Sequence, residues 1–209
     1  MSTQSRGRGL PTPRDPTLIY GLVLAGGHSK RMKTDKAAIR YHGKTQAEAT
    51  FERLSRFCDK VFLSDRREQA DLPGHAGLPQ IHDTFHEIGP LGGILSALAA
   101  HPDAAWLVLA CDLPYLDDAT LENLIRRRNP KKLATAYTSS HDGKPEPLCA
   151  IYEPHSRGPL EAILTGGIRC PRKALMQSDV ELLEPINPTA LDNMNTPEEY
   201  EIAMKRVPK

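Results

Sequence analysis

A glycine pair followed by basic residues comes directly after the first apolar segment. The stretch Leu24–Lys36 reads LAGGHSKRMKTDK and contains Gly26, Gly27, Arg31 and Lys36. Adjacent glycines let backbone N–H groups turn toward an anion, and the two cations add charge-assisted donors. A triphosphate carries about four negative charges, so this loop and one metal ion would nearly neutralise it. The pattern is neither the P-loop GxxxxGK[ST] nor the dinucleotide GxGxxG, and a solvated basic turn is the alternative interpretation.

A carboxylate and a second glycine-rich segment fit the same chemistry. Asp112 comes after the apolar run 104–110 and Cys111, and it precedes Leu113-Pro114. At the carboxyl end of a parallel strand, its oxygens would suit Mg²⁺ shared with phosphate, although capping a turn before Pro114 is the alternative. The segment Gly89–Gly93 (GPLGG) opens a helix, whose N-terminus would face a phosphate unless the glycines serve close packing.

Other site types are disfavoured. His82, Asp83, His86 and Glu87 lie close together, but the HExxH order of a helical zinc site is absent. No Ser/His/Asp grouping stands out among the eight histidines.

Apolar runs and helical patterns alternate along the chain and would position these residues. Thr45 and Glu48 predict a capping box at the start of the first helix. Strands are expected at 18–25, 60–64, 80–83, 104–110, 133–139, 148–152 and 180–183, and helices at 45–57, 91–100, 117–128, 159–164, 172–177 and from Thr196 onward. This alternation predicts a three-layer α/β/α sandwich on a mainly parallel, Rossmann-like sheet.

Length and composition favour one domain. Of the 209 residues we assign 18–209 to a single domain and 1–17, rich in Arg and Pro, to a disordered tail. The 27 Lys and Arg nearly balance 26 acidic residues, which argues against a general nucleic-acid or membrane-surface binder. No apolar run approaches the roughly 20 residues of a spanning helix. The four cysteines show no CxxC spacing, so we expect reduced thiols in a cytoplasmic protein.

With these residues in place, the chain resembles the molybdenum cofactor guanylyltransferase (MobA) family within the NTP-transferase superfamily. The family's opening pattern is close to LAGGxSxRMGxDKA, and the chain reads LAGGHSKRMKTDKA at 24–37. Further matches are GPLGG at 89–93, CDLPYL at 111–116, EPLCAIY at 146–152 and NMNTPEE at 193–199. These matches run in order over most of the chain.

The resemblance implies transfer of GMP from Mg-GTP to molybdopterin, with release of pyrophosphate. It also implies Mg²⁺ as the cofactor, held by Asp112, and transient contacts with cofactor-biosynthesis proteins or molybdoenzyme chaperones. The catalytic residues it implies are Arg31, Lys36 and Asp112, and the implied acceptor-binding residues are Asn193 and Asn195. Nucleotide binding is implied for Leu24, Ala25, Gly26, Gly27, Lys36, Ser64, Asp83, Gly89, Gly93 and Asp112.

Two positions depart from the family pattern. Lys33 replaces a glycine, which matters if that position needs φ > 0. Ser64 stands where some members have a nucleotide-contacting Asn. Three alternatives therefore remain open: a sister transferase that uses CTP or a sugar phosphate, a non-catalytic nucleotide-binding regulator, and a nicotinamide dehydrogenase, which the missing GxGxxG disfavours.

Overall fold

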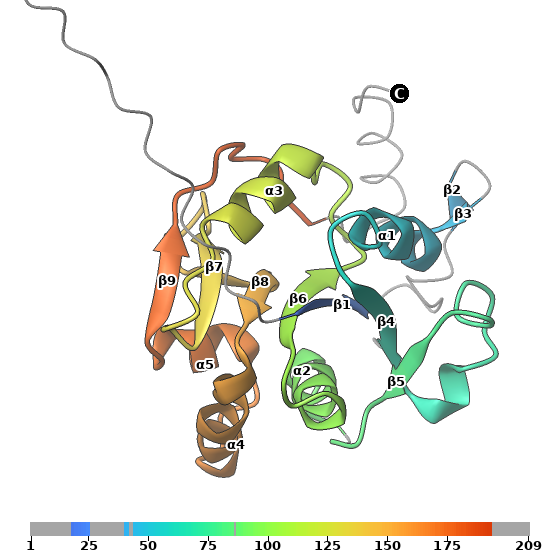
Figure 1. Cartoon of the computed structure of the whole chain (residues 1–209), viewed down its shortest axis with the longest axis horizontal. Coiled ribbons are helices and arrows are strands. Elements are labelled where there is room, and N and C mark those ends of the chain that lie inside the picture. Colours follow the sequence, from blue (N-terminus) through green and yellow to red (C-terminus); the bar gives the residue numbers. More distant parts are fainter. Residues whose placement is uncertain (1–17, 26–39, 42–43, 86, 194–209) are drawn as a thin grey trace, which may run out of the picture.

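The computed structural model describes residues 18–25, 40–41, 44–85 and 87–193 (Figure 1). The tail at 1–17 and the helix expected from Thr196 lie outside these residues. Within them, no helix is both long and apolar enough to cross a membrane. All four cysteines are free thiols, as the sequence predicted.

A seven-stranded sheet forms the centre of the domain, in the order β5-β4-β1-β6-β8-β7-β9. Strand β8 runs antiparallel to both of its neighbours, whereas the other neighbouring strands pair in parallel. The strands are β1 (Ile19–Leu24), β4 (Lys60–Asp65), β5 (Gln80–His82), β6 (Ala105–Ala110), β7 (Ala134–Thr138), β8 (Pro145–Tyr152) and β9 (Val180–Leu183). The predicted mainly parallel sheet is confirmed.

Helices cover both faces of this sheet (Figure 1). On one face pack α1 (Gln46–Leu54) and α3 (Asp118–Arg126), which bury Leu54 and Leu121. On the other face pack α2 (Pro90–Ala100), α4 (Arg157–Thr165) and α5 (Pro171–Met176). Every residue of the central strand β6 is buried, because helices cover it from both sides. The three-layer arrangement expected from the sequence is therefore present.

Local signals in the sequence explain where helices begin. The Thr45 hydroxyl accepts from the backbone N–H of Glu48 at 3.1 Å, and the Glu48 carboxylate accepts from the Thr45 N–H at 2.7 Å. This pair is the predicted capping box. At α3, the carboxylate of Asp117 accepts from the N–H of Thr120 at 2.8 Å.

Three strands differ from the prediction. Strand β8 begins at Pro145, three residues before the expected start at Leu148, because Pro145 pairs with Thr138 of β7 beyond a register shift. Proline is tolerated there at the first residue of the strand. The short antiparallel pair β2 (Arg40–Tyr41) and β3 (Lys44–Thr45) was not predicted, since two-residue strands carry no periodic pattern.

Candidate functional site

Four predicted nucleotide-binding residues converge at the carboxyl ends of the parallel strands. Leu24 of β1 lies in register with Ser64 of β4. The Ser64 hydroxyl donates to Oδ1 of Asp83, just after β5, at 2.8 Å. Gly93, in the first turn of α2, is the fourth of these residues and packs against two of the others. A Cβ at this position would lie 2.3 Å from Oγ of Ser64 and 3.0 Å from Cδ2 of Leu24. Position 93 therefore needs glycine, because helix α2 approaches the strand ends closely there.

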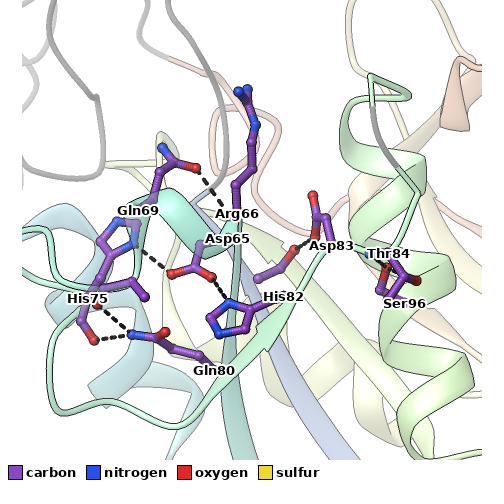
Figure 2. Close-up of polar contacts among 11 residues, drawn as sticks. Asp65, Arg66, Gln69, His75, Gln80, His82, Asp83, Thr84 and Ser96 are labelled. Atoms are coloured by element: carbon purple, nitrogen blue, oxygen red, sulfur yellow. Dashed lines mark hydrogen bonds and ion pairs between the residues drawn. The ribbon is translucent and has the colours of Figure 1, made fainter.

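The backbone around Asp83 is fixed on both sides. Its own N–H donates to the carbonyl of Asp65 at 2.8 Å. The N–H of Thr84 donates to Oγ of Ser96 at 2.9 Å (Figure 2). Ser96 in turn donates to the carbonyl of Gly92 at 2.8 Å. The position of Asp83 is thus set by β4 and by helix α2 together.

Asp65, at the end of β4, is a fully buried carboxylate that holds two histidines (Figure 2). Its Oδ2 lies 3.1 Å from Nδ1 of buried His75, and its Oδ1 lies 2.8 Å from Nδ1 of His82. Since an ionised carboxylate only accepts, each Nδ1 carries the proton. The cluster joins β4, β5 and the loop between them. No local sequence pattern predicts this cluster, because its partners lie 10 and 17 residues apart in the chain.

The beginning of α2 also lies at this edge. Gly89 caps the helix with φ of 72°, a conformation that favours glycine. A Cβ on Gly92 would approach the carbonyl oxygen of Phe85 to 2.7 Å. The first turn of an 11-residue helix therefore packs directly behind the segment that carries Asp83.

Ala25 follows β1 and is buried. Its backbone N–H donates to the carbonyl of Ser64 at 3.1 Å, so this donor is engaged within the sheet edge. The predicted residues Gly26, Gly27, Arg31, Lys36 and Asn195, as well as Lys33, lie outside the described residues.

Asp112 and Asn193 line one cavity of about 930 Å³. Asp112 follows β6, and the cavity extends from there to the turn between β7 and β8, to the start of α5 and to residues 191–193. Its volume falls in the range of small-molecule sites. Ala110, which also lines it, is the register partner of Leu24. The cavity is therefore adjacent to the strand ends that carry the first group of residues.

Charged pairs form part of the cavity wall. Arg172 donates to Glu146 at 2.7 Å and lies 3.5 Å from Oδ2 of Asp142. His141 contacts Asp192 at 2.7 Å, and the hydrogen bond with this carboxylate raises the pKa of His141 above its ordinary value. None of these five residues was predicted as a site residue, although Glu146 belongs to the EPLCAIY motif.

Cys149 lines the same cavity but is almost completely buried. Burial raises the pKa of its thiol to about 12, so the group is neutral at pH 7. Among the cavity residues it is an apolar wall component and not a nucleophile.

The described residues contain no group of three or more His, Cys, Asp or Glu side chains arranged to hold a metal ion. A single carboxylate at Asp112 still fits Mg²⁺, because this ion usually takes one or two protein carboxylates and completes its shell with water and substrate phosphate oxygens. A divalent metal, as NTP transferases generally use, is therefore compatible with the donors at this edge.

Comparisons with known proteins agree with this geometry. A family-wide sequence model described as the MobA-like NTP transferase domain matches residues 21–180. The chain is 32% identical over 180 residues to the molybdenum cofactor guanylyltransferase of Pseudomonas paraeruginosa, covering 85% of this chain and 90% of that one. It is 38% identical over 184 residues to a molybdenum cofactor biosynthesis bifunctional protein of Synechocystis. That match covers 88% of this chain but only 53% of the relative, so the chain spans about half of the bifunctional protein.

A solved structure shares the fold. The molybdopterin-guanine dinucleotide biosynthesis protein A of Archaeoglobus fulgidus superposes with a TM-score of 0.72 at 25% sequence identity, covering 89% of this chain and 97% of that one. The sheet, the clustered strand ends and these matches lead to one conclusion: the chain belongs to the MobA-like NTP transferase family and is a nucleotidyltransferase.

Proposed function

We propose that this chain transfers GMP from Mg-GTP to molybdopterin and releases pyrophosphate. The observation that carries the proposal is the position of Asp112, at the end of β6 on the wall of the 930 Å³ cavity and beside the strand ends of Leu24, Ser64 and Asp83. One edge of the sheet thus offers two adjacent regions, one for each substrate. The guanylyltransferase named among the relatives supports this choice of substrates.

The Ser64–Asp83 group would bind the nucleotide. Asp83 would accept N–H groups of guanine, and Ser64 would orient that carboxylate through its 2.8 Å hydrogen bond. Gly93 would let the nucleotide approach the beginning of α2, and Gly89 would shape the helix start. A base with neighbouring N–H and amino donors suits a carboxylate partner, which favours guanine over cytosine.

The attacking group would be the terminal phosphate of molybdopterin. This group is already an anion at pH 7, so the reaction needs no general base but needs in-line placement and charge neutralisation at the α-phosphorus of GTP. Arg31 and Lys36 would supply cationic donors to the phosphates, with the backbone of Gly26 and Gly27. Asn193, on the cavity wall, and Asn195 would contact the acceptor.

Asp112 would hold Mg²⁺. When bound, the ion would neutralise charge on the phosphate oxygens that it contacts. The four free thiols support a reducing compartment, the cytoplasm.

The test compares two aspartates at opposite ends of one strand. We expect Asp112→Ala to reduce GMP transfer to molybdopterin by about 100-fold or more, because it removes the metal carboxylate. Asp103→Ala, at an exposed position before β6, is the matched control and should transfer GMP at the wild-type rate. Unaltered circular dichroism would show that both variants fold. Substantial Mg²⁺-dependent GMP transfer by Asp112→Ala would contradict the role of Asp112 as the metal ligand. Transfer of CMP but not GMP by the wild-type chain would identify it as the related transferase that uses CTP.

A further inference from the structure

The cavity beside Asp112 has a polar wall that the nucleotide does not explain. Ser64, Asp83 and Gly93 do not line this cavity, although Pro90 at the start of α2 does. Its wall instead carries Glu146 at the start of β8 and Arg172 in the first turn of α5. A second substrate therefore has its own set of polar contacts.

The charged groups around Arg172 give no net attraction for an anion. Among the lining residues that the structure describes, Arg172 provides the single Lys or Arg side chain, and two carboxylates already pair with it. Lys144, whose Nζ lies 3.1 Å from Oδ2 of Asp142, and Arg172 together balance Asp142 and Glu146, so this corner is formally neutral. A phosphate dianion placed here would meet no net positive charge among these residues, and it would lie close to two carboxylates in a partly desolvated cavity, where repulsion is poorly screened.

The same pair suits a neutral ring with neighbouring donors and acceptors. A guanidinium has five N–H donors and a carboxylate has about four acceptor sites, so the single 2.7 Å hydrogen bond between Arg172 and Glu146 leaves capacity on both groups. Only 18% of the Glu146 side chain is exposed, and Arg172 fixes its carboxylate, which makes it a preorganised acceptor. Pro147 and Pro171, which are the chain neighbours of Glu146 and Arg172, add apolar surface to the same cavity wall.

We propose that Glu146 is a specificity residue that accepts the ring N–H and amino groups of the pterin part of the acceptor, and that Arg172 positions it. The inference rests on the proposed function and deepens it. Arg172 can also donate to the ring carbonyl next to the N–H. With the ring held here, repulsion by the carboxylate of Glu146 keeps the acceptor phosphate away from this part of the wall.

A phosphate-free pterin tests this contact directly. The probe is 6-hydroxymethylpterin, whose own fluorescence reports binding to the full chain. We expect Glu146→Gln to raise the Kd of the probe at least 10-fold, because an amide keeps one acceptor oxygen but presents an NH₂ donor to the second ring donor. Inorganic phosphate should not displace the probe. In the transfer reaction, the KM for molybdopterin should rise with the KM for GTP unchanged.

Two further variants control for packing. Glu161→Gln removes the carboxylate of a similar Arg–Glu pair, 2.8 Å long, on the surface of α4, and should bind the probe as wild type does. Glu146→Asp keeps a carboxylate and should bind the probe better than Glu146→Gln. If Glu146→Gln fails to fold, Glu146→Asp and Arg172→Gln are compared in its place. We expect both of these variants to bind the probe more weakly than the wild type and to bind GTP equally well.

The outcomes separate this inference from the proposed function. Wild-type GMP transfer together with unchanged probe binding by Glu146→Gln would overturn the inference alone. Displacement of the probe by phosphate would also overturn it, by assigning the wall to the acceptor phosphate. Glu146-dependent probe binding by a wild-type chain that transfers no GMP would support the pterin contact and reject the guanylyltransferase.

Discussion

The hydroxyl of Ser64 donates a 2.8 Å hydrogen bond to the carboxylate of Asp83 and so connects the ends of two neighbouring strands. Ser64 is 1% exposed, and its Oγ lies directly under the first turn of α2. The side chain therefore acts on the candidate nucleotide site mainly through Asp83. A serine at a position where some family members have asparagine is explained by this role as a short, buried donor.

Gly93→Ala tests how tightly α2 packs on this hydrogen bond. The new Cβ would lie 2.3 Å from Oγ of Ser64, so we expect a loss of about 1–3 kcal/mol in the free energy of unfolding. In a Ser64→Ala background the nearest atom becomes Cδ2 of Leu24 at 3.0 Å. There the helix propensity of alanine, about 1 kcal/mol better than glycine, should offset most of the penalty. Urea unfolding of the four chains measures this coupling, and additive effects of the two substitutions would contradict the predicted clash.

Asp65→Asn tests the buried cluster. An amide offers one acceptor where the carboxylate accepts from both His75 and His82, so one histidine must move its proton to Nε2. His82 is the one expected to change, because its side chain is 36% exposed, whereas Nε2 of His75 is buried without a hydrogen-bond partner in the described chain. We expect a loss of about 1–3 kcal/mol in the free energy of unfolding.

Nitrogen NMR of the histidine rings would identify the changed tautomer in the Asp65→Asn variant. The control is Asp179→Asn, which removes one partner of a surface pair with Lys132 and should change stability by less than about 0.5 kcal/mol. Equal effects of the two substitutions would show that the buried carboxylate has no special role.

The pair His141–Asp192 predicts a pH dependence at the cavity mouth. The hydrogen bond with Asp192 raises the pKa of His141 above its ordinary value of 6.5. The attraction between protonated His141 and Asp192 is therefore fully present below pH 6.5. It is lost as the pH rises through the higher pKa that His141 has in the folded chain. NMR titration of His141 should show a higher midpoint in the wild type than in Asp192→Asn. The difference should shrink with added salt, since His141 is largely exposed, and identical midpoints at low salt would refute the pairing.

Cysteine alkylation should distinguish the two thiols of the cavity wall. Cys170 is exposed, whereas Cys149 is buried with its thiol pKa raised to about 12. With iodoacetamide at pH 7.5 we expect Cys170 to react first and Cys149 only after unfolding, as followed by peptide mass spectrometry. Cys58, whose pKa burial also raises to about 12, provides the internal control and should stay unmodified in the folded chain. Alkylation of Cys149 and Cys170 at similar rates would mean that the cavity opens much further than the structure indicates.

Local patterns in the sequence predicted the elements well. The run 104–110 predicted the central strand β6, because only a strand covered on both faces is apolar at every position. Thr45 and Glu48 predicted the start of α1, since a capping box involves residues only three apart. The position of Asp112 at the edge where ligands bind likewise follows from chain order, because parallel strands end on one side of a sheet.

The contacts of the site depend on residues distant in the chain. Ser64 meets Asp83 across 19 positions, Asp65 holds His75 and His82, and Glu146 pairs with Arg172 across 26 positions. No periodicity encodes such pairs, because strand order and helix packing decide which side chains approach one another. The sequence by itself determined the α/β class, the family motifs and the residue types suited to nucleotidyl transfer. Only the tertiary structure decided which of these residues share a cavity, because that depends on how β6, β8 and α5 come together.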